Sequence, residues 1–250
     1  MSDKQNKFIN SDPLITSKVT DHKNNQNNSQ NNNQMISDSQ KPIEKFLMSN
    51  AHSSSNSAMS ETSMKTSYLK SSLRWVVFIS GEGSNLQALL DADPKIQIVT
   101  VVSSRAEAPG VARAKRLGVP TIIFSKDSSW MDLSNQLKQL MIDRIFLLGF
   151  MKVIPEIFIT EWKDKILNLH PSLLPNYRGL RAIERSYEDA AALGVTIHWV
   201  TPELDAGPIL LQREIFSQGQ VKEIPFEKVK AVIHQTENEM VVEAVRRIQK

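Results

Sequence analysis

The chain has 250 residues, of which 40% are hydrophobic and 23% charged, a composition typical of a globular protein. It contains no cysteine, which excludes disulfides, thiolate metal sites and iron–sulfur clusters and suits a reducing compartment such as the cytoplasm. The net charge of +3 is scattered without a basic stripe, and no apolar run reaches about 18 residues, so we expect neither a nucleic-acid partner nor a membrane partner.

Residues 1–72 differ in composition from the rest of the chain. Residues 24–34 are almost entirely Asn and Gln, and residues 53–72 are rich in Ser, Thr, Met and Lys. Such a segment buries too little apolar surface to offset its conformational entropy, so we expect a disordered extension with at most a short helix near 42–48. The expected domains are therefore a low-complexity extension, 1–72, and a folded domain, 73–250.

The folded part begins with a continuous apolar run, Trp-Val-Val-Phe-Ile at 75–79, which is typical of a parallel strand buried on both faces. The run ends in Ser-Gly-Glu-Gly-Ser-Asn at 80–85, and Leu86, Leu89 and Leu90 then have helical spacing. Glycines next to the free N–H groups of a helix start can bind an anion. Two glycines are fewer than dinucleotide or P-loop signatures contain, so a turn that only connects strand and helix is the alternative.

Strand and helix patterns then alternate along the chain. Strands are expected at 96–102, 121–124 and 145–148, and helices at 109–117, 130–142 and 155–162. This alternation predicts a mostly parallel, doubly wound sheet of the Rossmann-like type. The strand ends at Ser80, Gly149 and Asn168 should meet at one edge and form a crevice.

The last part of the chain has a different pattern. We expect a helix at 180–193, strands at 195–200 and 209–211, and a final helix that begins at Pro225. The two strands are too close in sequence for a helical crossover, which predicts an antiparallel pair. The expected fold class is therefore α/β: a mostly parallel doubly wound sheet with an antiparallel C-terminal strand pair, preceded by the disordered extension.

The motif Asn-Leu-His-Pro-Ser-Leu-Leu-Pro at 168–175 lies where a buried strand opens into a proline-bracketed loop. Asn168 and His170 are two residues apart, so on a strand they share a face and could stabilise an oxyanion and move a proton. Asp205, in a loop flanked by Gly and Pro, could hold the imidazole and favour its cationic form. The alternatives are a structural Asn–His pair and an aspartate that only shapes a turn.

Three separated stretches together resemble the phosphoribosylglycinamide formyltransferases, a branch of the folate-dependent formyltransferase family. These stretches are the turn at 80–85, the motif at 168–175 and Leu-Asp-Ala-Gly-Pro at 204–208, and the resemblance covers about residues 75–250. It implies formyl transfer from the co-substrate 10-formyltetrahydrofolate to the amine of glycinamide ribonucleotide, in de novo purine (IMP) biosynthesis. No metal is expected.

The resemblance also implies roles for individual residues. The catalytic residues would be Asn168, His170 and Asp205. The substrate phosphate would be bound by Gly83, Ser84 and Asn85, and the amine end of the substrate by Glu237. The folate pocket would be formed by Phe150, Met151, Lys152, Val153, Val200, Thr201 and Asp205. Leu174–Pro175 corresponds to a cis peptide of the family.

Other functions compete with this one. The first is another folate formyl enzyme, either a methionyl-tRNA formyltransferase or a formyltetrahydrofolate hydrolase, and the second is a non-catalytic protein that binds a nucleotide or folate. The tRNA-modifying relatives append a C-terminal domain and the hydrolases a folded N-terminal one, and the sequence predicts neither. We therefore expect a cytoplasmic enzyme, a monomer or homodimer, whose partners are small-molecule substrates.

Overall fold

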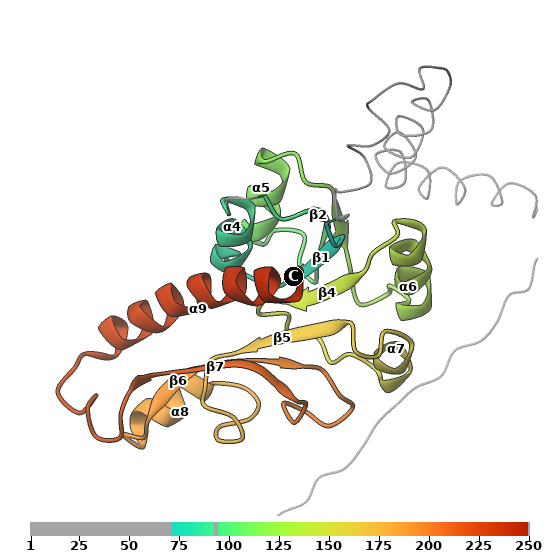
Figure 1. The fold of residues 1–250 in the computed structure, drawn as a ribbon. Helices are drawn as coiled ribbons and strands as arrows, with labels where there is room; N and C mark the ends of the chain where they lie inside the picture. The colour runs from blue at the N-terminus through green and yellow to red at the C-terminus, as the bar shows by residue number, and fades with distance from the viewer. Residues whose placement is uncertain (1–71, 93–94, 250) are drawn as a thin grey trace, which may run out of the picture. The chain divides into compact units, whose positions relative to one another are not determined.

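The computed structural model describes residues 72–92 and 95–249. The disordered extension and the short helix expected within residues 1–71 lie outside this range. In the described part, helices lie on both faces of one seven-stranded sheet (Figure 1). No helix among these residues combines the length and the apolar character that crossing a bilayer requires.

The sheet has the strand order β3-β2-β1-β4-β5-β6-β7. Its strands are β1 (Trp75–Ile79), β2 (Ile98–Ser103), β3 (Thr121–Ile123), β4 (Arg144–Leu147), β5 (Ile166–His170), β6 (Leu193–Trp199) and β7 (Ile209–Phe216). Strands β1 to β5 pair in parallel, whereas β6 is antiparallel to both β5 and β7. The predicted fold class is therefore confirmed for the described residues.

The helices follow the predicted alternation. They are α4 (Ser84–Leu90), α5 (Pro109–Arg116), α6 (Trp130–Gln139), α7 (Glu156–Glu161), α8 (Ala182–Glu188) and α9 (Phe226–Gln249). The helix expected at 180–193 is shorter than predicted, and Leu193 begins β6 instead. The chain pairs with β7 there instead of continuing the helix. Gly194 lies so close to β7 that a Cβ on it would be 2.2 Å from the Arg213 carbonyl oxygen.

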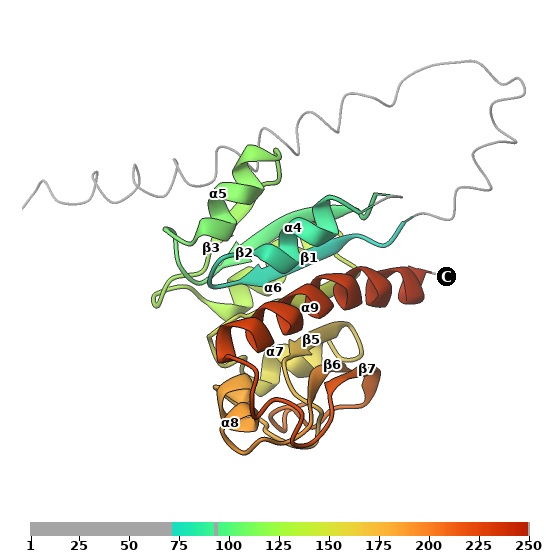
Figure 2. The ribbon, with the colours of Figure 1, turned by 90° about the vertical axis from the view of Figure 1, so that its left-hand side faces the viewer.

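Two core layers lie on opposite faces of the sheet, and β1 contributes to both. Trp75, Val77 and Ile79 belong to the layer beneath α4 and α9, which run side by side on that face (Figure 2). Val76 and Phe78 belong to the layer beneath α6 and α7. All five residues of β1 are buried, as a parallel strand covered on both faces requires.

The carboxyl ends of β1, β4 and β5 are neighbours at one edge of the sheet. The chain leaves β1 toward β2 on one side, while β4 pairs with β1 on the other, so this is the point where the winding direction reverses. The two strand ends are joined by the Met151 N–H, which donates to the Ser80 hydroxyl at 2.8 Å. The predicted meeting of strand ends at this edge is confirmed.

Candidate active site

The three predicted catalytic side chains lie together at the end of β5. Asn168 and His170 extend from the same face of β5, and Asp205 comes from the loop between β6 and β7. One carboxylate oxygen of Asp205, Oδ1, accepts a hydrogen bond from Asn168 Nδ2 at 3.3 Å. The other, Oδ2, lies 3.4 Å from His170 Nδ1. Asp205 therefore links the amide and the imidazole, which is more than shaping a turn requires.

Main-chain contacts fix the position of the loop that carries Asp205. Asp205 has a φ of 49°, in the left-handed region. Gly207 passes so close to β6 that a Cβ would lie 1.8 Å from the Trp199 carbonyl oxygen. The Gly179 N–H donates to Asp205 Oδ2 at 2.8 Å. A glycine at 207 and a main-chain donor at 179 thus fix the position of the carboxylate.

The charge states of His170 and Asp205 follow from their burial. Burial lowers the pKa of His170, although the Tyr177 carbonyl and Asp205 oppose this shift. The expectation of a cationic His170 is therefore wrong, because desolvation outweighs the carboxylate. Burial also disfavours ionisation of Asp205, but contacts with His198 and the Gly179 N–H outweigh it and lower the Asp205 pKa to about 2. Asp205 is a carboxylate beside a neutral imidazole.

The predicted phosphate-binding residues form the start of α4. Gly83 has a φ of 72°, and a Cβ there would be 2.7 Å from the Gly110 Cα at the start of α5. Gly110 in turn donates its N–H to the Gly81 carbonyl at 3.1 Å. No described side chain caps α4, and Ser84 is exposed, so the N–H groups of its first turn stay available. We refer to residues 83–85 as the phosphate turn.

Glu237 lies next to the phosphate turn. It is buried on α9, and its Oε2 accepts hydrogen bonds from Asn85 Nδ2 at 3.3 Å and from His234 Nδ1 at 2.9 Å. The bond to Glu237 raises the pKa of His234. Glu237 therefore contacts the phosphate turn directly, through Asn85.

The predicted folate-binding residues divide into two groups. Phe150 packs against Phe78, with ring centroids 5.1 Å apart, and Val200 packs against the same core layer. Met151 and Val153 are instead exposed, at 65% and 90%. These residues follow β4 and β6, the two neighbours of β5, so they flank the strand that carries Asn168 and His170.

The remaining predicted folate contacts are polar: Asp205, described above, Lys152 and Thr201. Lys152 Nζ donates to the Ser125 carbonyl at 3.3 Å and lies 5.7 Å from the centroid of the Phe124 ring. Thr201 Oγ1 donates to the Glu203 carbonyl at 3.2 Å. Neither side chain contacts the Asn168–His170–Asp205 group through these bonds, and the folate role of both stays a prediction.

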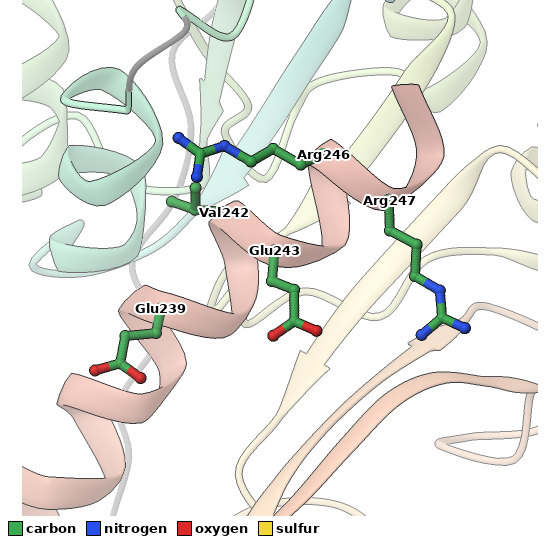
Figure 3. Close-up of a pocket in the computed structure, with 5 residues that line it drawn as sticks. All are labelled: Glu239, Val242, Glu243, Arg246 and Arg247. Atoms are coloured by element: carbon green, nitrogen blue, oxygen red, sulfur yellow. The ribbon is translucent and has the colours of Figure 1, made fainter. Parts of the chain in front are cut away.

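A separate groove lies on the C-terminal half of α9 (Figure 3). It is lined by Glu239, Val242, Glu243, Arg246 and Arg247. Arg213 of β7 pairs with Glu239 at 3.0 Å and with Glu243 at 2.8 Å, so these carboxylates hold α9 against β7. None of the predicted site residues lines this groove. Within the described ranges no group of three or more His, Cys, Asp or Glu side chains could hold a metal ion.

Comparison with known proteins decides the family. The family model described as Formyl transferase matches residues 73–245. The chain belongs to the formyl transferase family. A phosphoribosylglycinamide formyltransferase of Haemophilus influenzae is 38% identical over 161 residues, covering 59% of this chain and 76% of that protein. The human trifunctional purine biosynthetic protein adenosine-3 is 36% identical over 182 residues, covering 67% of this chain but only 18% of that much longer protein.

Solved structures agree with this formyl transferase fold. The phosphoribosylglycinamide formyltransferase of Anaplasma phagocytophilum is 38% identical, with a TM-score of 0.67 over 71% of this chain and 87% of that one. The glycinamide ribonucleotide transformylase 1 of Geobacillus kaustophilus is 33% identical, with a TM-score of 0.67 over 72% of this chain and 100% of that one. The sequence resemblance to this family is therefore confirmed.

Three groups of the candidate site were not indicated by the sequence. His198 of β6 lies opposite Asn168, and its Nε2 is 3.2 Å from Asn168 Nδ2 and 3.6 Å from Asp205 Oδ1. Only the antiparallel register of β5 and β6 places it there. Tyr177 and Gly179 act through main-chain groups, which no side-chain motif can indicate.

Replacing Asp205 with asparagine should lower the pKa of His170 further, because the carboxylate is one of the groups that raise it. Titration of the His170 ring by NMR in the wild type and in Asp205→Asn measures the shift. Asp127→Asn, an exposed aspartate in the loop before α6, is the matched control and should leave the curve in place. Identical His170 curves for the wild type and Asp205→Asn would rule out the pairing.

The lowered His170 pKa also sets a pH dependence of stability. Because the folded-state pKa lies below the unfolded value of about 6.5, the unfolded chain binds more protons at pH values between the two. His170 therefore makes the free energy of unfolding fall as the pH drops below about 6.5. Chemical denaturation of the wild type and of His170→Gln across this range should show a smaller acid-side loss in the variant, and parallel curves would contradict the buried neutral imidazole.

Proposed function

We propose that this chain transfers the formyl group of 10-formyltetrahydrofolate to the amine of glycinamide ribonucleotide, a step of de novo purine biosynthesis. One observation carries the proposal: the Asn168–His170–Asp205 group and the phosphate turn lie at the same edge of one sheet, on β5 and β1, with only β4 between them. Neighbouring strands are about 4.8 Å apart, so the two halves are roughly 10 Å apart. One small phosphorylated amine can span that distance. The names of the relatives support the same reaction.

The phosphate turn is proposed to bind the substrate phosphate. The free N–H groups at the start of α4 and the exposed hydroxyl of Ser84 are donors suited to phosphate oxygens. Glu237, adjacent to the turn, would repel a phosphate but accepts hydrogen bonds from neutral donors. We therefore assign it to the part of the substrate that leads from the phosphate toward the amine.

The formyl donor is proposed to lie across the ends of β4 and β6. The exposed side chains of Met151 and Val153 offer apolar surface to its flat ring system, and Phe150 and Val200 support the surface from below. Lys152 and Thr201 supply the polar contacts of the same pocket. The formyl group would then point at His170 on the strand between them. The donor is a co-substrate, consumed in each turnover, and the proposed chemistry uses no metal.

The chemical steps follow from the groups at the end of β5. The lone pair of the substrate amine attacks the formyl carbon, and the formyl oxygen becomes an oxyanion. The Asn168 amide and the His170 imidazole are placed to stabilise that charge, a contribution of about 3 to 4 kcal/mol for one well-placed donor. In the structure Asn168 Nδ2 donates to Asp205, so this amide turns toward the oxyanion as it forms, and His170 joins it once its Nδ1, which faces Asp205, has taken up a proton.

Proton transfer completes the reaction. The attacking nitrogen loses a proton, which the neutral His170 accepts directly or through a water that Asp205 orders. The imidazolium then lies between the oxyanion and the Asp205 carboxylate, which both stabilise it. Donation of the proton to N10 of the folate releases tetrahydrofolate as the bond between the formyl carbon and N10 breaks. Formylated amine and tetrahydrofolate are the products.

An acceptor assay tests the proposal against its rivals. The protein is mixed with 10-formyltetrahydrofolate and with glycinamide ribonucleotide, methionyl-tRNA or water alone as acceptor, and tetrahydrofolate release is followed. Glycinamide ribonucleotide should be the fastest acceptor, because only it fills both the phosphate turn and the catalytic group. Faster deformylation in water, or a preference for methionyl-tRNA, would assign the activity to a rival, and no turnover with any acceptor would indicate a binding protein.

Two further predictions belong to this proposal. The absence of cysteine is compatible with a cytoplasmic enzyme. A site built for small molecules requires no nucleic-acid or membrane partner. We propose that the enzyme acts in the cytoplasm as a monomer or homodimer, and size-exclusion chromatography with light scattering distinguishes the two states.

A further inference from the structure

We infer that Arg185 is a positioning residue for the catalytic group, acting through the loop at residues 176–180, which we call the bracket loop. The inference rests on the proposed formyl transfer for its kinetic readout. Its geometric basis is independent of the substrate, because the bracket loop contacts both His170 and Asp205 in the structure.

The bracket loop holds the catalytic pair through two main-chain groups. His170 Nε2 donates to the Tyr177 carbonyl at 2.9 Å, and the Gly179 N–H donates to Asp205 Oδ2 at 2.8 Å. These bonds fix the imidazole from the side opposite to Asp205 and the carboxylate from the side opposite to Asn168. A shift of this short segment therefore moves both catalytic side chains at once.

The backbone of the bracket loop is strained and belongs to no helix or strand. Tyr177 and Gly179 have φ values of 56° and 79°, in the left-handed region, so its backbone adopts a conformation that costs free energy for a residue such as tyrosine. Such a conformation persists only where surrounding contacts stabilise it. The contacts must come from outside the loop.

Arg185 supplies contacts at the middle of the bracket loop. It is half-buried on α8, and its Nη2 donates to the Arg178 carbonyl at 2.5 Å, between the two residues that hold the catalytic pair. Its guanidinium also lies over the Tyr177 ring, 5.7 Å from the centroid. Stacking on the ring while donating in the guanidinium plane is a geometry available to arginine but not to lysine.

Other contacts secure the bracket loop at its first residue and through its side chains. The Ser172 hydroxyl donates to the Asn176 carbonyl at 2.7 Å, and the Tyr177 hydroxyl donates to Asp189 at the end of α8. Arg178 pairs with Glu203 on the surface at 2.7 Å. Arg185 differs from these because it donates to the main chain of the segment from Tyr177 to Gly179, at the Arg178 carbonyl, whereas Tyr177 and Arg178 make the other contacts through their side chains.

Arg185 also acts on the charge of His170. The charged or titratable groups that influence the His170 pKa are Asp205, which raises it, and His198 and Arg185, which lower it. A guanidinium in this position therefore helps to keep the imidazole neutral and ready to accept a proton. Loss of positioning and loss of the positive charge should change kcat and the His170 pKa differently, so two substitutions of Arg185 can separate them.

Arg185→Gln and Arg185→Lys test the inference, with Arg181→Gln as the matched control. Arg181 lies at the start of the same helix, but its side chain is 69% exposed and forms an ion pair with Glu188 on the surface. Arg185→Gln should lower kcat about ten- to a hundredfold, the effect of a small misplacement of catalytic groups, with little change in the KM for glycinamide ribonucleotide. Its His170 pKa, measured by NMR without substrate, should lie above that of Arg185→Lys, since the positive charge is gone.

Arg185→Lys separates positioning from charge. It should lower the His170 pKa while kcat falls, because lysine preserves the charge but not the combination of stacking and donation, so the Tyr177 carbonyl that raises this pKa moves away. Arg181→Gln should match the wild type in both readouts. The NMR titration needs no turnover, so it tests the bracket loop even if glycinamide ribonucleotide is not the substrate, and it does so with Arg185→Lys if Arg185→Gln fails to fold.

Three results would overturn the inference. The first is a wild-type kcat and an unshifted His170 curve in both Arg185→Gln and Arg185→Lys. The second is an equal loss of kcat in Arg181→Gln, which would show that the effect belongs to α8 in general. A His170 shift without a change in kcat would also reject positioning and leave only the electrostatic contribution.

Discussion

Replacing His170 with alanine should lower kcat by about 10²- to 10³-fold, the loss observed when one donor to an oxyanion is removed. Asn168→Ala should have an effect of the same order. Both side chains lie at the end of β5 and are proposed to act on the formyl group rather than on the ring system held by the ends of β4 and β6, so neither change should weaken folate binding appreciably. The two variants should therefore separate turnover from affinity, which is the expected signature of groups that act in the transition state.

Steady-state kinetics with glycinamide ribonucleotide, together with titration of a non-reactive folate analogue, measures both quantities. Thermal unfolding of each variant checks that the fold is retained. The double variant is informative because residues that act as a unit are not additive, so its loss should be smaller than the product of the two single losses. Equal losses in folate affinity and kcat, or activity near that of the wild type, would contradict the catalytic assignment.

Replacing Gly83 with alanine should raise the KM for glycinamide ribonucleotide about ten- to a hundredfold, equivalent to about 1.4 to 2.8 kcal/mol of lost binding free energy. A Cβ there would lie 2.7 Å from the Gly110 Cα, a contact with backbone that cannot yield easily, and the φ of 72° disfavours any side chain. The phosphate turn must therefore shift away from α5, and its N–H groups no longer converge on one phosphate.

Gly118→Ala is a closely matched control for this change. Gly118 has a φ of 73°, so alanine meets the same backbone strain, but its Cβ would find nothing within 4 Å. The control should lower stability by about 1 kcal/mol or more while the KM stays near the wild-type value. If the two variants raise the KM equally, strain alone explains the result and the phosphate assignment of residues 83–85 fails.

Much of the sheet follows from the sequence because its strands are buried. Apolar runs such as 75–79 and 145–148 separated by amphipathic segments are sufficient to predict β1 and β4 and their parallel pairing. The joining of Asn168, His170 and Asp205 is also foreseeable, because strand periodicity places the first two on one face and the family resemblance supplies the third.

The antiparallel end of the sheet is less predictable. Strand β7 extends to Phe216, beyond the apolar residues 209–211, because it lies at the sheet edge and alternates exposed polar residues with half-buried ones. Helix α8 ends at Glu188, and the chain begins β6 at Leu193, where it pairs with β5 and β7. Both differences come from tertiary pairing, which local propensity does not contain.

The electrostatics of the site could not be predicted from residue types. A neighbouring carboxylate correctly suggests a higher His170 pKa, yet the degree of burial decides the net direction, and burial depends on the whole fold. The same holds for the bracket loop, whose carbonyl and N–H groups belong to positions where the side chain carries no signal. The position of His198 depends on a strand register that only the structure provides.

A crystal structure of the protein with glycinamide ribonucleotide and a non-reactive folate analogue tests the central claim most directly. The account predicts the phosphate within hydrogen-bond distance of the main-chain N–H groups of residues 83–85, and the amine beside Asn168 and His170 at the other end of the same molecule. The folate analogue should lie against Met151 and Val200. A phosphate bound elsewhere, or an amine directed away from His170, would contradict a single site that spans β1 to β5.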